Sequence, residues 1–442
     1  HETAYTATGY YLAAGFLLSL GLKLQSEERK RDKRTALAET TAHTLLAAHA
    51  LHTAFAPAAS PWETAVSYLS VGGFLCFFAL LAPFSRERDD TAAWNFGLRG
   101  TALLAVALAI GHVMWGGLSL LLLSAGELFG LPVDGRCYYY IYVVCGELLS
   151  LTLFLGLLPR GAEKYDRQPL SWGFLARVTR YLFLPLVGGY LVLLYAYALR
   201  ILLLWELPNG WCAWPVTILM GGCLGLEMLL YPVRRSEGRR FDERVAQWLP
   251  LLIVPLLLLM TAGISKRLSD YGLTVPRLYL LTLNIWFYAL CIGLFLTRAR
   301  RLRGVPASFA LLFLLASALP VNYTTLTRDH IARQVERTME QTLPRGVQPP
   351  LDKAKYEAWL RSLPEEEARR MNDKLSYLHT GFSREAIAPF IEDNVAYALY
   401  QYRPDAAPHG SYIRDASLGA DAVILLPAGY TRLMSVCYLM TE

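Results

Sequence analysis

The sequence contains few charged residues for its length. Asp, Glu, Lys and Arg make up 18% of the 442 residues, whereas hydrophobic residues make up 54%. A soluble domain carries about 25% charged residues, and here the apolar residues are gathered in long runs. The composition therefore excludes an ordinary soluble domain and indicates a polytopic membrane protein.

The sequence also lacks the short motifs of familiar catalytic sites. It contains no H-E-x-x-H, P-loop, G-x-S-x-G or dinucleotide-binding motif. An inverted repeat with paired broken helices, which would favour a carrier, is not visible either. Whether the chain is an enzyme stays open, its catalytic residues are unknown, and we expect no cofactor.

Cysteine and histidine show no metal-binding pattern. None of the seven cysteines forms a pair with the two-residue spacing of a zinc or redox motif. Cys137 and Cys212 would both lie near the outer surface and could pair, although isolated packing cysteines are the usual case. His49 and His52 share a helix face, but His43 is rotated away from both, so this helix alone does not offer a metal site. We expect no metal.

The apolar runs are illustrated by residues 190–211, YLVLLYAYALRILLLWELPNGW. As a helix, this segment places Tyr190, Tyr197 and Arg200 on one face. It then ends in aromatic, acidic and turn-forming residues, which is typical of a helix leaving a bilayer.

Ten such runs predict an all-α polytopic membrane bundle of about ten transmembrane helices within residues 1–321. The runs lie at about 8–24, 36–58, 64–83, 98–125, 138–158, 181–204, 211–231, 248–264, 278–297 and 308–321. Gly-Gly pairs inside several runs are explained by close helix packing.

The basic residues alternate between the connections of these runs. If the first run crosses from outside to inside, the inner connections hold 22 Lys and Arg and the outer ones only four. This asymmetry follows the positive-inside rule and predicts the bacterial inner membrane, with residues 322–442 outside the cytoplasm. The formal charge of +6 therefore reflects topology rather than nucleic-acid binding.

Residues 322–442 predict a separate extracytoplasmic α+β domain. Helices are expected at 325–343, 351–363 and 365–378, and strands at 397–402, 422–426 and 433–440. The chain opens without Met and stops directly after the last of these strands. We therefore expect a fragment, with a truncated C-terminal domain.

Several motifs resemble a known family. LYAYALRI at 194–201, WELPNGW at 205–211 and DYGLTVPR at 270–277 are similar to a bacterial family of polytopic inner-membrane proteins, the domain of unknown function DUF4153. The resemblance covers most of the chain and is clearest in the second half of the membrane region. It implies a fold and a location, and it brings no reaction, cofactor or catalytic residue.

Polar residues at the outer ends of two neighbouring helix pairs form the first candidate site. Arg and Lys could hold an anionic headgroup or glycan there, with Trp and Tyr stacking on it. The alternative is an interfacial belt with two structured loops. The residues are Arg200, Trp205, Glu206, Asn209, Trp211, Lys266, Asp270, Tyr271, Thr274 and Arg277.

Ionisable residues inside the apolar runs form the second candidate group. Glu147 lies near the middle of its run, where a carboxylate normally faces the bundle interior or a wet cavity. It could bind a proton or contact a substrate, or it could be a packed carboxyl bonded to a neighbouring Tyr. Glu227 lies nearer the inner surface, where Arg234 and Arg235 could pair with it. Arg99 and His112 belong to the fourth run.

The sequence is consistent with three functions. A scaffolding or partner-binding component of an envelope complex is favoured by the large outer segment and the missing chemistry. The alternatives are a permease-like carrier and a membrane-embedded enzyme or assembly factor that handles lipid or glycan. The expected partners are the lipid bilayer, an envelope protein, and a lipid or glycan ligand.

Overall fold

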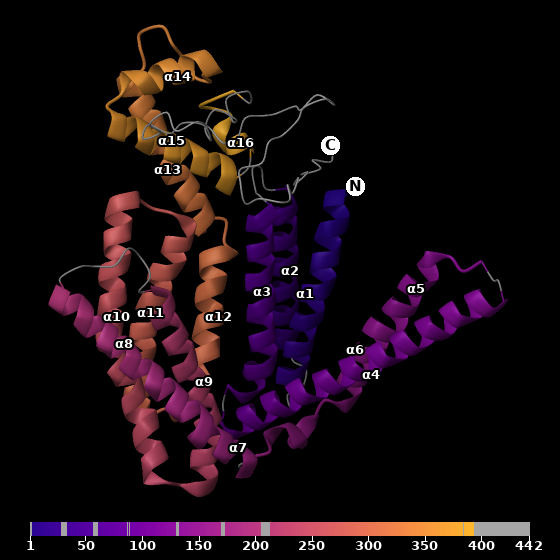
Figure 1. The fold of residues 1–442 in the computed structure, drawn as a ribbon. Coiled ribbons are helices and arrows are strands. Elements are labelled where there is room, and N and C mark those ends of the chain that lie inside the picture. Colours follow the sequence, from indigo (N-terminus) through magenta and orange to yellow (C-terminus); the bar gives the residue numbers. More distant parts are fainter. Residues whose placement is uncertain are drawn as a thin grey trace, which may run out of the picture.

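The computed structural model describes residues 2–27, 33–55, 61–85, 87, 89–129, 132–168, 173–204, 213–382 and 384–392. The secondary structure within these ranges is almost entirely helical (Figure 1). The helices of the membrane region are α1 (Glu2–Ser26), α2 (Lys33–Phe55), α3 (Pro61–Leu81), α4 (Thr91–Phe129), α5 (Gly135–Ile141), α6 (Ser150–Leu157), α7 (Gly173–Val178), α8 (Leu184–Leu204), α9 (Ala213–Glu237), α10 (Arg240–Tyr271), α11 (Val275–Thr297) and α12 (Gly304–Ser317). Between them lie the 3₁₀ segments η1 (Ala82–Phe84) and η3 (Gly161–Tyr165) and the π-helical segments η2 (Tyr142–Leu149) and η4 (Thr179–Phe183).

The first bundle consists of α1, α2 and α3, joined by α12 from much later in the chain. Its core contains small and branched apolar side chains such as Ala14, Leu18 and Val71. His49 lies between Tyr10 and Ser67, with hydroxyl oxygens 3.0 Å from each ring nitrogen. The ring is thus bonded to side chains of neighbouring helices, as a packed histidine requires. Among the described residues, no three His, Cys, Asp or Glu side chains form a group that could hold a metal.

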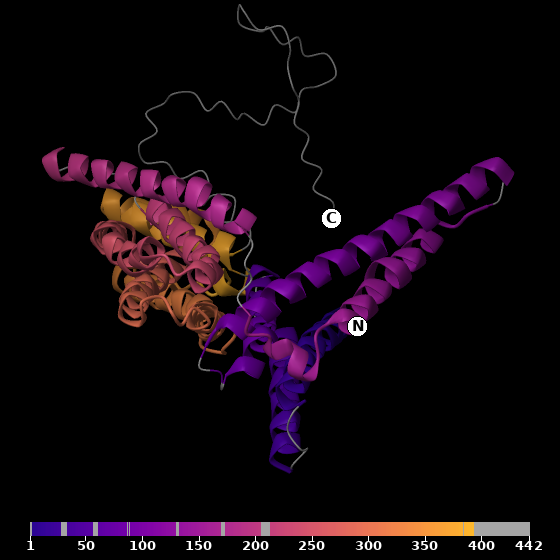
Figure 2. The same ribbon diagram turned by 90° about the horizontal axis from the view of Figure 1, so that it is seen from below.

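The second bundle consists of α8, α9, α10 and α11. Helix α9 is the most enclosed of the four, because Met220, Cys223, Leu226 and Leu230 on it are fully buried against α10 and α11. In Figures 1 and 2 this bundle stands beside the first one, and α9 and α12 lie where the two approach each other.

Helix α4 and the segment α5–η2–α6 form a helical hairpin that extends away from both bundles (Figures 1 and 2). The two arms pack closely at Gly111, since a Cβ there would lie 2.6 Å from the Cys145 carbonyl oxygen. Most other side chains of the hairpin are exposed, including the apolar Val113, Leu120 and Leu121. The hairpin therefore presents apolar surface on nearly all sides, as expected for helices surrounded by lipid.

The segment after α12 forms a small helical unit at the end of the bundles where α12 finishes (Figure 1). Its helices are α13 (Tyr323–Thr342), α14 (Lys353–Ser362), α15 (Glu365–Gly381) and α16 (Arg384–Ile387). Trp359, Tyr356 and Leu375 are among its buried core residues. The three helices expected here are confirmed. The described part of the unit has one isolated bridge, Leu351 to Ile391, and no sheet. The expected strands lie outside the described residues, so an α+β domain is not supported.

Eight described helices are long and apolar enough to cross a membrane, fewer than the ten expected. The two expected runs that are not among these eight are α2 and α12. Helix α2 is interrupted by polar residues such as Glu39, Thr40 and His43. Helix α12 has 14 residues, which span roughly 21 Å at 1.5 Å per residue, short of the roughly 30 Å hydrocarbon layer. Both nevertheless run beside longer helices of the first bundle.

The connections predicted to be basic and internal meet at one end of the molecule, called here the arginine-rich end. Lys164 donates hydrogen bonds to the Leu24 carbonyl and to Glu27 at 2.7 and 3.0 Å. Arg167 pairs with Glu87 at 2.9 Å. These contacts join the connections after α1, α3 and α6. The unit of α13–α16 lies at the opposite end of the bundles (Figure 1).

Candidate functional site

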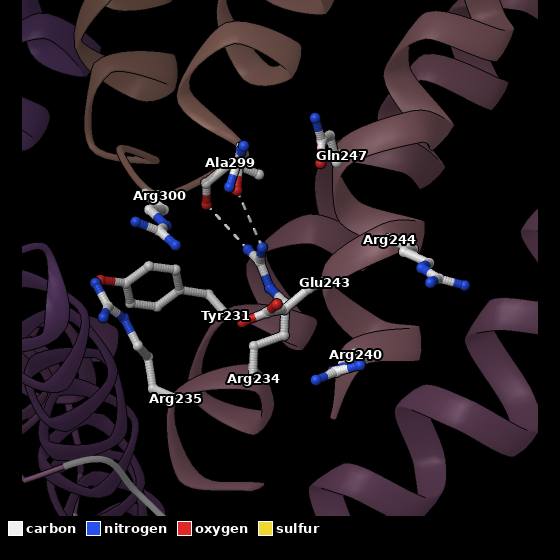
Figure 3. Close-up of a pocket in the computed structure, with 10 residues that line it drawn as sticks. Tyr231, Arg234, Arg235, Arg240, Glu243, Arg244, Gln247, Ala299 and Arg300 are labelled. Carbon is white, nitrogen blue, oxygen red and sulfur yellow. Dashed lines mark hydrogen bonds between the residues drawn. The ribbon is translucent and has the colours of Figure 1, made fainter. Parts of the chain in front are cut away.

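A cavity of about 390 Å³ opens at the arginine-rich end of the second bundle. It is formed by the end of α9, the start of α10 and the turn after α11, and Figure 3 shows how these elements surround it. We call it the arginine pocket. Its described lining is Tyr231, Arg234, Arg235, Arg240, Glu243, Arg244, Gln247, Arg298, Ala299 and Arg300.

Arg234 is the most fixed of the six arginines. Its side chain is only 9% exposed. Its two terminal nitrogens donate to the carbonyl oxygens of Arg298 and Ala299, at 3.3 and 2.9 Å (Figure 3). Backbone acceptors therefore fix this guanidinium in the wall of the pocket.

The turn that supplies these carbonyls has an unusual backbone. Arg298 and Ala299 both have φ of 50°, in the left-handed region that residues with a Cβ rarely adopt. The turn ends α11 and directs both carbonyl groups toward Arg234. Sparsely populated backbone conformations of this kind gather at functional sites, and here one shapes the pocket wall.

Four further guanidinium groups have no partner among the described residues. They belong to Arg240, Arg244, Arg298 and Arg300, and all four residues are exposed. Glu243 is the one carboxylate in the described lining. A cavity with this excess of positive charge is suited to bind an anion, and the forked donors of arginine match phosphate oxygens in particular.

A second network lies directly beside the pocket and joins the two bundles. Asp89, just before α4, accepts hydrogen bonds from the Tyr231 hydroxyl at 2.6 Å and from Arg235 at 3.1 Å. Burial alone would raise the pKa of Asp89, but hydrogen bonds from Tyr231 and Thr91 and the charge of Arg235 outweigh it and lower the pKa below its usual value. Asp89 is therefore ionised and holds Tyr231 in place.

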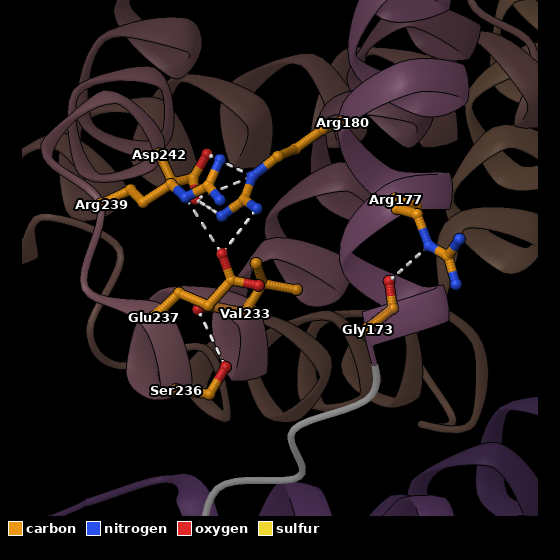
Figure 4. A network of polar contacts seen from close by, with 8 residues as sticks. All are labelled: Gly173, Arg177, Arg180, Val233, Ser236, Glu237, Arg239 and Asp242. Carbon is orange, nitrogen blue, oxygen red and sulfur yellow. Dashed lines mark hydrogen bonds and ion pairs between the residues drawn. The ribbon is translucent and has the colours of Figure 1, made fainter.

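The start of α10 is anchored by a third network, shown in Figure 4. Asp242 is completely buried and is bound by the guanidinium of Arg180 through Nε and a terminal nitrogen. The other terminal nitrogen of Arg180 donates to Glu237 at 2.7 Å. Arg180 thus joins η4 to both sides of the α9–α10 turn, which carries one wall of the arginine pocket.

Glu227 lies deeper in α9 than the pocket. It is fully buried, and neither carboxyl oxygen has a hydrogen-bond partner among the described residues. One oxygen lies 3.6 Å from Arg234, and among the described residues no ion pair links Glu227 to Arg235. The arrangement matches the expected structural pairing with Arg234 more closely than an open binding group.

The other intramembrane residues lie on or near the hairpin. Glu147 is exposed in η2 and accepts a hydrogen bond from Tyr142 at 2.5 Å. His112 is also exposed, and its ring meets Trp115 and Tyr142 edge-on. Arg99, at the base of α4, pairs with Asp166 at 2.6 Å. The expectation that Glu147 faces the bundle interior does not match its exposed position, because the hairpin stands apart from the bundles.

Much of the expected outer cluster falls outside the described residues, including Trp205, Glu206, Asn209 and Trp211. Cys212, considered as a partner of Cys137 in the sequence, also lies outside them. Arg200 is exposed at the end of α8, Lys266 is exposed in α10, and Arg277 donates to the Gly272 carbonyl. Asp270 and Tyr271 end α10, and their side chains are not described.

Sequence reasoning did not single out the arginine pocket. It treated VRRSEGRRFDER and the arginines at 298–303 as signs of membrane topology only. The sequence did contain a signal for this pocket, because three arginine-rich helix ends were all expected on the inner side of the membrane.

These features define a class, a polytopic helical membrane protein with an arginine-lined pocket at one end of its bundle. Within that class the chain belongs to the family described as "Domain of unknown function (DUF4153)", which matches residues 6–341 and confirms the resemblance of the motifs. The chain is also similar to "Uncharacterized protein PM1469" of Pasteurella multocida (strain Pm70), with 23% identity over 290 residues. That alignment covers 59% of this chain and 48% of the relative, about half its length. No solved structure matches the chain.

Proposed function

We propose that this membrane protein binds a phosphate-bearing anion in the arginine pocket. The observation that carries the proposal is the set of four guanidinium groups, without partners in the described part of the chain, around a cavity of about 390 Å³. That volume lies within the range of roughly 300–1,000 Å³ found for small-molecule sites. Arginine forks and phosphate oxygens form short, charge-assisted, paired hydrogen bonds.

The pocket is also preorganised for an anion. Arg234 is already desolvated and held by two carbonyl groups, so little additional ordering is needed when a ligand arrives. Tyr231 and Gln247 add neutral polar groups to the wall. These groups bind and orient an anion, and none of them forms a recognisable catalytic set.

Replacing Arg244 or Arg240 by glutamine is expected to weaken the binding of inorganic pyrophosphate about 10- to 100-fold. Hydrogen bonds to charged groups contribute about 1.5–3 kcal/mol each, which corresponds to this range of affinity. Binding is measured by calorimetry on the detergent-purified protein. Arg301→Gln is the matched control, because Arg301 is exposed nearby and does not line the described pocket. Equal loss in all three variants, or no binding to the native protein, contradicts the proposal.

We also propose that the arginine-rich end faces the cytoplasm of a bacterial inner membrane, with α13–α16 outside. The 22-to-four distribution of basic residues supports this orientation. In a cysteine-free background, a membrane-impermeant thiol reagent is expected to label Thr380→Cys in intact cells and Ser236→Cys only after permeabilisation. Both positions are exposed. The reverse pattern inverts the orientation.

Partner binding is a second candidate function, favoured by one observation on the hairpin. Glu147 is exposed among apolar side chains there, and a carboxylate facing lipid costs about 2.5–3.5 kcal/mol. A partner helix with a hydrogen-bond donor would remove that cost, as in a scaffolding component of an envelope complex. Glu147→Gln is expected to reduce co-purification of a partner from native membranes, whereas Glu127→Gln at the hairpin tip is not. A native protein that always purifies alone counts against this role.

A further inference from the structure

A second cavity, of about 300 Å³, lies between the two bundles. Its walls come from α3, α4, α9 and the start of α12, and they are mostly apolar. Phe77, Leu80, Leu98, Met228 and Leu302 are among the lining residues. We call it the apolar cavity. Nothing in this lining resembles the arginine pocket except Arg303 and Asp90, which pair with each other at 3.2 Å.

The two cavities share one wall residue, Tyr231. Its side chain is almost completely buried, its hydroxyl is bound by Asp89, and Arg235 lies over its ring, 5.6 Å from the centroid. The charged cavity and the apolar cavity therefore adjoin at one fixed aromatic ring.

The apolar cavity also has an unpaired polar group in its wall. Trp94 lines it, and the indole N–H of Trp94 has no acceptor among the described residues. A buried N–H without an acceptor is unfavourable. The carbonyl oxygen of a fatty acyl ester is an acceptor that an apolar ligand can bring into such a site.

We infer that the anion bound in the arginine pocket is the headgroup of a phospholipid, and that one acyl chain of this lipid occupies the apolar cavity. The inference rests on the proposed function and specifies its ligand class. A soluble phosphate would leave the apolar cavity unused, and a neutral lipid would leave the four guanidinium groups unpaired. An anionic glycerophospholipid satisfies both cavities, and its ester carbonyls, which lie between the phosphate and the chains, supply acceptors for the indole N–H of Trp94.

Three soluble probes separate the contributions of headgroup and chain. They are dioctanoyl phosphatidic acid, glycerol 3-phosphate, which keeps the phosphate without chains, and dioctanoylglycerol, which keeps the chains without phosphate. Binding to the full chain in a neutral detergent is measured by calorimetry below the micellar concentration of each probe. Phosphatidic acid is expected to bind at least about 10-fold more tightly than either other probe, because methylenes leave water while the phosphate is paired.

A substitution that fills the apolar cavity then tests the contribution of the acyl chain to binding. Gly97 lines it, and a Cβ at Gly97 meets nothing within 4 Å, so Gly97→Leu places a side chain where the acyl chain would lie. This variant is expected to bind phosphatidic acid no better than glycerol 3-phosphate, with glycerol 3-phosphate affinity unchanged. Gly116→Leu, in the open part of α4, is the control. If Gly97→Leu does not fold, Thr101→Leu at an exposed position of the same wall replaces it.

The outcomes distinguish this inference from the proposed function. Equal affinity for phosphatidic acid and glycerol 3-phosphate, unaffected by Gly97→Leu, overturns the lipid inference and leaves the anion site in place. Equal affinity for phosphatidic acid and dioctanoylglycerol overturns it as well, because the phosphate then adds nothing. If neither phosphate probe binds, the proposed function itself fails.

Discussion

Replacing Arg303 by alanine is expected to lower the free energy of unfolding by about 3–5 kcal/mol, the range for breaking a buried ion pair. Arg303 binds the connection before α4 at several points. Its guanidinium donates to the carbonyl oxygens of Phe84 and Glu87, and its Nε lies 3.2 Å from the carboxylate of Asp90. Its backbone N–H donates to Asp90 as well, at 2.9 Å.

The expected loss of unfolding free energy is large because the carboxylate that Arg303 binds is buried. The Asp90 side chain is only 4% exposed, so without Arg303 its charge would lose its ion-pair partner in a place that water hardly reaches. The 23% exposure of Arg303 places the effect toward the lower end of the range, since part of the pair is screened. These contacts join the start of α12 to the connection between α3 and α4, so their loss also loosens this end of the first bundle.

The measurement is unfolding of the purified protein in mixed micelles as the fraction of denaturing detergent rises. Arg301→Ala provides the control, since Arg301 is exposed two residues away and has no ion-pair partner among the described residues. Its expected effect is within about 0.5 kcal/mol, as for most surface substitutions. A similar effect of both substitutions would mean that charge at this end matters and the Arg303 contacts do not.

Much of the membrane fold could be predicted from the sequence, because apolar runs and arginine positions report directly on insertion. The run predicted at 211–231 corresponds to α9, and the run predicted at 278–297 corresponds to α11. The pairing of helices could not be predicted. Helix α12 packs on α3, far away in the sequence, and Gly21 of α1 allows a close approach to Phe78 of α3, whose ring would lie 2.7 Å from a Cβ at that position. Such contacts depend on the shapes of facing surfaces, which no periodicity records.

The candidate site was less predictable for the same reason. Arg234 and Ala299 are 65 residues apart, and only the packing of α9, α10 and α11 brings them to 2.9 Å. The charge of Glu147 was visible in the sequence, but its exposure was not, because amphipathic pattern alone does not tell which helices a hairpin will meet. The pairing of Glu227 with Arg234 was easier to predict, because a residue seven positions later returns to the same helix face.

Substituting Arg180 by glutamine is the other change with a large expected effect, again about 3–5 kcal/mol of unfolding free energy. The Asp242 side chain is completely inaccessible, and Arg180 is its ion-pair partner in Figure 4. Glutamine can replace one hydrogen bond and cannot replace the charge. Asp242 would then stay buried as an unpaired carboxylate, which is far less favourable than an exposed one.

A double substitution tells whether this loss comes from the unpaired charge or from the missing side-chain volume. Arg180→Met with Asp242→Leu removes both charges and keeps apolar bulk, and it is expected to recover most of the stability, because well-packed apolar pairs replace buried ion pairs at little cost. Arg177→Gln, one turn earlier, is the control for general charge loss, since Arg177 is exposed and donates to the carbonyl of Gly173 in its own helix (Figure 4). Because Arg180 and Asp242 anchor the α9–α10 turn, Arg180→Gln should also weaken pyrophosphate binding, and the double variant should restore it. If the double variant is as unstable as Arg180→Gln, then packing around Asp242, rather than its charge, holds this wall of the arginine pocket.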